Sequence, residues 1–299
     1  MHLSSIGFRL TTVMIIASIT MLAACVSPSR DSSQGNDGGE TAEPEIPVEP
    51  RSYIFVQAHR GSTTDYPELT LAAFDAALEA GVDRIEMDLA ITADDEVVLM
   101  HDISVDRTTD GSGRVESFTL EELKQLDAGS WHSERFADER VPTLREVIEI
   151  VDGRAELNLE VKTKRRSGLL VNRIIEETVS LVEEMGAEDQ VLYSSFEVDA
   201  LLEVRERDPE ARLLLLDWLP GASYDGITKA VDNNLYAWSP SAEHITEERV
   251  QQARRAGLST HVGAAPGRRA REYIEWGIDG LSSGNPVELV QFLEREGYR

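Results

Sequence analysis

Acidic side chains recur inside two short apolar runs of the sequence. Glu86 and Asp88 alternate with apolar residues in the run 84–91, and Glu160 lies two positions before Lys162 in a later run. Successive side chains of a strand point to opposite faces, so each pair is expected to share one face. Charges on the inner face of a fold are costly unless they are paired or metal-bound. The three carboxylates therefore indicate a counterion, and oxygen ligands favour Mg²⁺ or Ca²⁺ over zinc.

Two histidines stand at the ends of other apolar runs. His59 follows the run 53–58 and precedes Arg60, and His101 ends the run 97–101. A single histidine at such a place is more often a hydrogen-bonded structural residue than a catalytic one. Here the histidines and carboxylates gather at the ends of several runs, and this grouping favours a functional site.

The elements that must position these residues follow an alternating pattern of short apolar runs and amphipathic stretches. Strands are expected at 53–58, 84–91, 97–101, 156–162, 190–195, 211–217, 235–239, 258–263 and 278–282. Helices are expected at 68–80, 119–127, 143–151, 168–186, 197–207, 246–256, 268–276 and 286–296.

Nine strands are one too many for a closed α/β barrel. Residues 93–96 are the only link between the second and third runs. A parallel crossover needs about a dozen residues, so the third run is expected to return as the arm of a β-hairpin. Eight parallel strands remain, which is the number in a (β/α)8 TIM-type barrel. In such barrels the chemistry sits at the carboxyl ends of the strands.

The first 24 residues are typical of an export signal. They contain one Lys or Arg, which is Arg9, and no acid, and their apolar stretch 13–24 is too short to cross a bilayer. The stretch ends in Leu22-Ala23-Ala24-Cys25, which resembles the cleavage box of bacterial lipoproteins. Cys25, the only cysteine of the chain, is accordingly expected to carry a lipid anchor.

The next segment, 25–50, is expected to be a flexible tether that follows the lipidated cysteine. It holds four of the eleven prolines and almost no large apolar residues, so it cannot bury a core. Residues 51–299 are then the barrel domain. This organisation predicts a protein anchored in a bacterial cell envelope, on its periplasmic or extracellular face.

The charge balance limits the partners of this domain. The chain has 29 Lys and Arg against 55 Asp and Glu, a formal net charge of −26. A general nucleic-acid binder needs a basic surface, so this class is excluded. One cysteine also excludes a disulfide framework.

Several segments, in order, resemble the glycerophosphodiester phosphodiesterase family. The first are His59-Arg60-Gly61, Pro67-Glu68 and Ala73-Phe74, followed by Ile85-Glu86-Met87-Asp88 and His101-Asp102. The order continues with Arg107-Thr108-Thr109-Asp110-Gly111-Ser112-Gly113, Leu126-Asp127-Ala128-Gly129, Val141-Pro142-Thr143-Leu144 and Leu159-Glu160-Val161-Lys162. Ser195-Phe196 and Gly277-Ile278-Asp279-Gly280 extend the resemblance, which covers about 53–286.

The resemblance implies metal-dependent hydrolysis of a small glycerophosphodiester to glycerol 3-phosphate and an alcohol. The implied metal ligands are Glu86, Asp88 and Glu160, with Mg²⁺ or Ca²⁺ as the ion. The implied acid/base pair is His59 and His101, and the implied phosphate contacts are Arg60 and Lys162. The alternatives are a phospholipase D- or C-like enzyme acting on lysophospholipids, and a non-catalytic surface-binding lipoprotein.

Several points stay open at this stage. The residues do not decide which histidine is the acid, or whether the nucleophile is the glycerol 2-hydroxyl or water. They also leave open the alcohol, the choice of ion, the membrane and the oligomeric state. Departures from the family pattern include Leu69, where members usually have Asn, and the segment 260–265 near the end of a late strand. These departures concern the alcohol side of the pocket.

Overall fold

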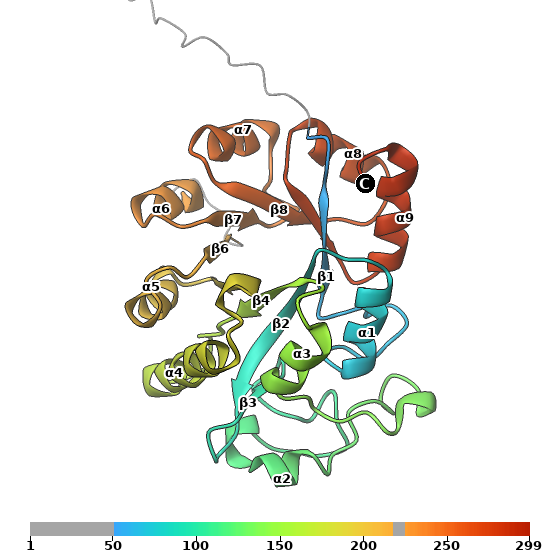
Figure 1. The fold of residues 1–299 in the computed structure, drawn as a ribbon, viewed down its shortest axis with the longest axis vertical. Helices are drawn as coiled ribbons and strands as arrows, with labels where there is room; N and C mark the ends of the chain where they lie inside the picture. The colour runs from blue at the N-terminus through green and yellow to red at the C-terminus, as the bar shows by residue number, and fades with distance from the viewer. Residues whose placement is uncertain (1–50, 218–224) are drawn as a thin grey trace, which may run out of the picture. The chain divides into compact units, whose positions relative to one another are not determined.

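Parallel strands close into a barrel in the computed structural model, which describes residues 51–217 and 225–299 (Figure 1). The barrel strands are β1 (Phe55–His59), β2 (Arg84–Ile91), β4 (Glu156–Glu160), β5 (Val191–Ser195), β6 (Leu213–Asp217), β7 (Ala237–Pro240), β8 (Ser259–Gly263) and β9 (Gly280–Ser283). Strand β1 pairs in parallel with both β2 and β9, which closes the ring. The predicted (β/α)8 TIM-type barrel is therefore confirmed.

The remaining strand, β3 (Val97–Leu99), runs antiparallel to β2, with Leu99 opposite Leu89. The turn between the two strands is held by Thr92, whose hydroxyl accepts from the backbone N–H of Glu96 at 2.9 Å. Asp95 adopts a φ of 69° in this turn. The predicted β-hairpin after the second strand is confirmed.

The helices lie around the outside of the ring (Figure 1). They are α1 (Leu71–Glu79), α3 (Leu144–Val151), α4 (Gly168–Met185), α5 (Val198–Arg207), α6 (Gly226–Asp232), α7 (Glu247–Arg255), α8 (Arg268–Glu275) and α9 (Pro286–Glu296). None of the helices in the described part of the chain is long and apolar enough to cross a membrane.

The sequence prediction missed α6. This helix has only seven residues, and its buried residues are Gly226, Ile227 and Ala230. Asp225 caps its first turn by accepting from two backbone N–H groups. Its apolar pattern is too short to produce a helical signal, because the fold, not the local sequence, supplies most of its stability.

Residues between β3 and α3 form an insertion with a small core of its own. Its α-helix, α2 (Leu120–Leu123), is only four residues long, so the predicted helix 119–127 is wrong beyond its first turn. The insertion also contains two 3₁₀ turns, Val115–Ser117 and Glu134–Phe136. The small core joins Ala90 of β2 and Val98 of β3 to buried apolar residues of the insertion, which are Met100, Val105, Val115, Leu123, Ala128 and Val141.

The barrel has an outer core and an asymmetric interior. On β2, Ile85, Met87 and Leu89 pack in the core that contacts the helices, so Glu86 and Asp88 face the interior, as predicted. Across the barrel, Leu192, Leu214 and Ala237 of β5, β6 and β7 form a buried apolar cluster. The carboxylates of the predicted site lie on the opposite side of the interior, on β2 and β4. Cys25 and the predicted boundaries at 24 and 50 lie outside the described residues.

Candidate active site

Three buried carboxylates from two neighbouring strands meet beside the carboxyl ends of β1 and β4. Glu86 and Asp88 lie on β2 and Glu160 ends β4, where it pairs in register with Asp88. One oxygen atom from each of the three lies within 4.8 Å of the others. The convergence that the strand alternation predicted is thus present.

Two cationic side chains hold the middle carboxylate. Lys162 Nζ lies 3.0 Å from Asp88 Oδ1 and donates to Glu160 Oε1 at 2.9 Å. Arg60 Nε lies 3.1 Å from Asp88 Oδ2. Asp88 is fully buried, and burial alone would raise its pKa, but Lys162 and Arg60 outweigh burial and hold the pKa below its usual value.

The other two carboxylates lack sufficient positive charge. Burial, together with the neighbouring Asp88 and Glu160, raises the pKa of Glu86 well above its usual range. Burial and the Asp88 charge raise the pKa of Glu160 to about 7. Both shifts express the same imbalance. Among the described residues, Arg60 and Lys162 form ion pairs with the three carboxylates, and Arg166 contributes its charge without forming an ion pair with them.

The donor set fits a hard divalent cation. Glu86 Oε1 is buried and has no hydrogen-bond partner among the described residues. An unpartnered buried carboxylate oxygen is costly, and a cation shared with Asp88 and Glu160 would satisfy it. All three ligand atoms are oxygens, which suits Mg²⁺ or Ca²⁺.

His59 ends β1, and the strained turn that follows brings Arg60 to this cluster. Arg60 has a φ of 58°, and its backbone N–H donates to Glu86 Oε2 at 3.0 Å. Gly61 follows with a φ of 89°, and a Cβ on it would lie 2.9 Å from the Ala73 backbone. Only glycine fits this close approach, which explains the His-Arg-Gly order of the sequence.

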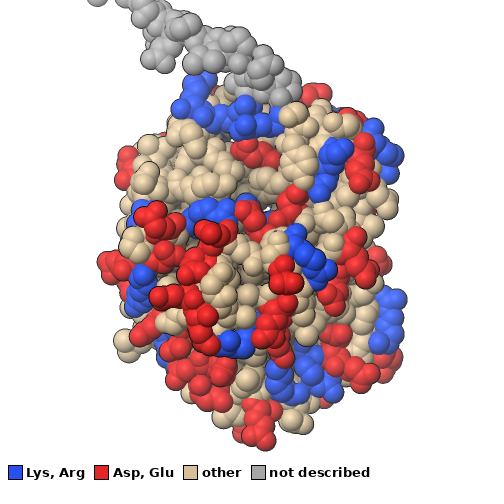
Figure 2. All heavy atoms as spheres, viewed as in Figure 1, with Lys and Arg blue, Asp and Glu red and all other residues tan. Residues whose placement is uncertain are grey.

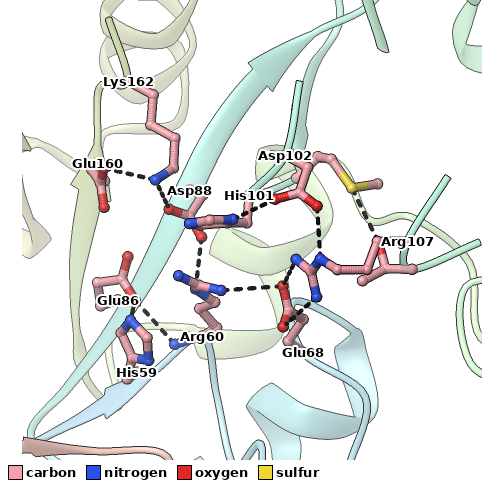
Figure 3. A network of polar contacts seen from close by, with 12 residues as sticks. His59, Arg60, Glu68, Glu86, Asp88, His101, Asp102, Arg107, Glu160 and Lys162 are labelled. Atoms are coloured by element: carbon pink, nitrogen blue, oxygen red, sulfur yellow. Dashed lines mark hydrogen bonds and ion pairs between the residues drawn. The ribbon is translucent and has the colours of Figure 1, made fainter. Parts of the chain in front are cut away.

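The His59 ring lies beside Glu86, with 3.9 Å between Nε2 and Oε2 (Figure 3). Burial of part of the ring and the neighbouring Arg60 charge lower the pKa of His59 to about 4. Half of the side chain is exposed, so solvent weakens this shift. His59 is therefore a neutral, solvent-reachable imidazole at the edge of the carboxylate cluster.

His101 approaches the cluster from the end of the hairpin, and its ring lies between Asp88 and Asp102 in Figure 3. Nδ1 of His101 is 2.7 Å from Asp102 Oδ1. Asp102 in turn accepts from Arg107 Nε at 2.7 Å, and Arg107 also binds Glu68. Sequence reasoning gave no roles to Glu68, Asp102 and Arg107, although all three lie in the segments that carried the family resemblance.

The structure brings together all seven residues that the sequence placed in the site, namely His59, Arg60, Glu86, Asp88, His101, Glu160 and Lys162. Their individual roles remain predictions. Arg60 and Lys162 matter because the chain as a whole is acidic, with a formal net charge of −26, and Asp and Glu side chains are spread over the face seen in Figure 2. A surface of this sign repels an anionic substrate at long range, so local cations must bind it.

One departure from the family pattern lies beneath the site. His261 on β8 is buried, and its ring packs edge-on against Phe55 with 5.7 Å between ring centres. Burial first, and then the charge of Arg84, lower the pKa of His261 to about 3. His261 is thus a neutral interior histidine.

Comparisons with known proteins agree with this geometry. A family model described as the glycerophosphoryl diester phosphodiesterase family matches residues 59–288. The glycerophosphodiester phosphodiesterase of Caldanaerobacter subterraneus subsp. tengcongensis is 36% identical over 245 residues, which cover 81% of this chain and 98% of that protein. The enzyme of that name from Bacillus altitudinis is also 36% identical, over 255 residues, 79% of this chain and 97% of that protein.

Solved structures give the same result. An Oleispira antarctica phosphodiesterase in complex with the product sn-glycerol-3-phosphate matches with a TM-score of 0.74 and 28% identity. The match covers 81% of this chain and 97% of that chain. The segment matched by the family model includes all seven residues that the sequence placed in the site.

Proposed function

The chain belongs to the glycerophosphoryl diester phosphodiesterase family, and from that premise we propose that it hydrolyses a glycerophosphodiester to glycerol 3-phosphate and a free alcohol in a reaction that needs a divalent cation. One observation carries the metal dependence. Three buried carboxylates face two cations, and Glu86 Oε1 has no hydrogen-bond partner among the described residues. A bound cation completes this charge balance.

Glu86, Asp88 and Glu160 would hold the cation, which when bound polarises a phosphoryl oxygen and neutralises its charge. Arg60 and Lys162 orient the phosphate. The side chains of Arg60 and Lys162 both contact Asp88, and each has further N–H groups that can donate hydrogen bonds to the substrate phosphate. Positioning of this kind, more than covalent chemistry, is what phosphoryl transfer requires.

His59 and His101 carry the proton transfers. One ring takes a proton from the nucleophilic oxygen as the new P–O bond forms. The other ring gives a proton to the alcohol oxygen as the old P–O bond breaks, so that no free alkoxide is released. The nucleophile is either water or the glycerol 2-hydroxyl. In the second case the alcohol leaves as a cyclic phosphate forms, and water then cleaves its P–O bond to the 2-oxygen to give glycerol 3-phosphate.

The site is tested by product analysis. The purified protein is incubated with glycerophosphocholine, glycerophosphoethanolamine and glycerophosphoglycerol, each with Mg²⁺, with Ca²⁺ and with chelator. We expect cation-dependent release of glycerol 3-phosphate from at least one of them. A folded, cation-binding protein that releases none, but cleaves a lysophospholipid, would be a lipid-cleaving enzyme instead. A folded, cation-binding protein that is inert toward all of these substrates would favour the non-catalytic binding alternative.

The same chain is proposed to act at a membrane surface, anchored through lipid on Cys25. The support is the Leu-Ala-Ala-Cys order and the proline-rich segment 25–50 that follows. In a bacterial host, Cys25→Ser is expected to abolish incorporation of labelled fatty acid and to prevent maturation of the precursor. Unchanged labelling of the Cys25→Ser protein would contradict the anchor.

A further inference from the structure

The insertion between β3 and α3 sends one arginine to the edge of the site. Arg107 donates to both oxygens of Glu68, with Nη2 2.7 Å from Oε1 and Nη1 3.1 Å from Oε2. Its Nε donates to Asp102 Oδ2 at 2.7 Å. A single guanidinium thus binds two carboxylates that come from different parts of the chain (Figure 3).

Each of these carboxylates binds a residue of the predicted reaction centre. Asp102 uses its other oxygen, Oδ1, to contact His101 Nδ1 at 2.7 Å. Glu68 Oε1 lies 3.3 Å from Arg60 Nη1, and Arg60 contacts Asp88. The contacts form one continuous chain that links the acid/base histidine to the phosphate-binding arginine through Arg107.

The contact with Asp102 determines which nitrogen of His101 carries the proton. An ionised carboxylate only accepts hydrogen bonds, so Nδ1 must donate and Nε2 is left for exchange with substrate. Burial raises the pKa of Asp102, but hydrogen bonds from Arg107 and His101 outweigh it and keep the carboxylate ionised.

The backbone that carries Arg107 is fixed. Thr108 and Thr109 are buried, and their hydroxyls donate to Met100 Sδ at 3.3 Å and to the Val105 carbonyl at 2.8 Å. The Arg107 side chain itself is 44% exposed. Ion pairs this exposed contribute little to stability, so the network is poorly explained as a folding device.

We propose that Arg107 is a positioning residue: through Asp102 it holds His101 in the Nδ1–H tautomer, and through Glu68 it holds the Arg60 guanidinium against Asp88. The catalytic part of this inference rests on the proposed function, whereas the tautomer does not depend on it. Lysine cannot replace Arg107, because one ammonium group lacks the planar fork that serves two carboxylates at once.

The test compares Arg107→Ala and Arg107→Lys with the control Arg114→Ala. Arg114 lies in the same insertion, is similarly exposed at 47%, and pairs with Glu116 instead of Glu68 or Asp102. We expect the kcat for glycerol 3-phosphate release to fall about 10- to 100-fold in both Arg107 variants, with cation affinity retained. The Arg114→Ala protein should stay within about twofold of wild type, as expected for an exposed ion pair.

A second measurement is independent of turnover. Nitrogen-15 NMR of the imidazoles, at a pH where the rings are neutral, should show His101 protonated on Nδ1 in wild type. Both Arg107 variants should shift toward a mixture of tautomers, and the control should not. Unchanged His101 shifts in both Arg107 variants would overturn the proposal. A tautomer change with kcat within about twofold of wild type would overturn its catalytic part.

The two hypotheses fail in different ways. If wild type releases no glycerol 3-phosphate, the proposed function fails, while the NMR comparison still decides whether Arg107 positions His101. If Arg107→Ala does not fold, Arg107→Lys retains the charge and supplies both readouts.

Discussion

Asp88 and Asp217 are two buried acids on barrel strands, yet they serve different purposes. Asp88 on β2 is fully buried and faces the barrel interior beside two other carboxylates. Asp217 on β6 is 3% exposed and follows Leu213 and Leu215 on the opposite, outer face. It accepts from Trp238 Nε1 at 2.9 Å and from Arg249 Nη2 at 3.0 Å.

The two acids differ in whether the neighbouring cations and hydrogen-bond donors balance the negative charge. Asp217 has a cation and an indole donor, and a Cβ on Gly226 would lie only 2.3 Å from its Oδ2, so the described residues approach it closely. The acids around Asp88 share two cations among three carboxylates. A buried acid whose charge is balanced, such as Asp217, links a strand to a helix. A cluster of acids with too little positive charge, such as the one around Asp88, is a candidate ligand site.

Removing a proton-transfer group should have the largest effect. We expect His59→Ala or His101→Ala to lower kcat by about 10²- to 10⁴-fold with little change in the unfolding midpoint. The control is His132→Ala, because the His132 ring packs on Trp131 and Phe136 in the insertion. Initial rates of glycerol 3-phosphate release measure the effect, and full activity in either active-site variant would refute the assigned roles.

Loss of the cation that pairs with Asp217 should lower the stability of the protein and leave its activity unchanged. Arg249→Leu leaves the Asp217 charge buried with only the Trp238 donor, which we expect to cost about 3 kcal/mol of unfolding free energy. Arg255→Leu, an exposed change on the same helix, should cost less than about 0.5 kcal/mol. Urea denaturation separates the two, and a lowered kcat in Arg249→Leu would show that this region also serves the site.

Substitution of an acid in the cluster of Glu86, Asp88 and Glu160 should weaken cation binding. Glu160 and Glu156 lie on the same strand, but Glu156 pairs with Arg84 and Arg212 at the other end. Glu160→Gln should weaken cation affinity by at least about 100-fold, or about 2.7 kcal/mol, because it removes a ligand. Calorimetric titration with Mg²⁺ or Ca²⁺ should show no such loss in Glu156→Gln.

The smallest expected effect concerns His261 and pH. Its folded pKa of about 3 lies below the unfolded value of 6.5, so the unfolded chain binds a proton that the folded chain does not. Stability is therefore lost as pH falls below about 6.5, by up to about 1.4 kcal/mol per pH unit. Between pH 7 and pH 5, His261→Gln should lose up to about 2 kcal/mol less than wild type, measured by urea denaturation. Equal losses would contradict this account.

Strand alternation and chain length were enough to predict much of the barrel. The alternation in 84–91 placed Glu86 and Asp88 on the inner face, and the short link 93–96 identified the hairpin. The insertion was harder, because its α-helix is a single turn stabilised by contacts within its own small core. Contacts of that kind leave no periodic pattern in the sequence.

Residue types and the family segments were enough to predict the seven residues of the site, but not the contacts that surround them. Arg107 and Glu68 are 39 positions apart, and their pairing depends on how the insertion folds against β1 and α1. Leu69 shows the same limit. Its φ of 56° is a left-handed conformation that Asn adopts more readily than Leu, so the usual Asn there has a backbone reason as well as a polar one.

The central claim is that Glu86, Asp88 and Glu160 hold the cation on which turnover depends. The most direct test is glycerol 3-phosphate release by protein that has been stripped with chelator, then titrated with Mg²⁺ or Ca²⁺, for wild type and Asp88→Asn. The account predicts no release by stripped wild type, a saturable return with added cation, and no return in Asp88→Asn at the same concentrations. Full release by stripped wild type with no measurable bound cation would contradict it.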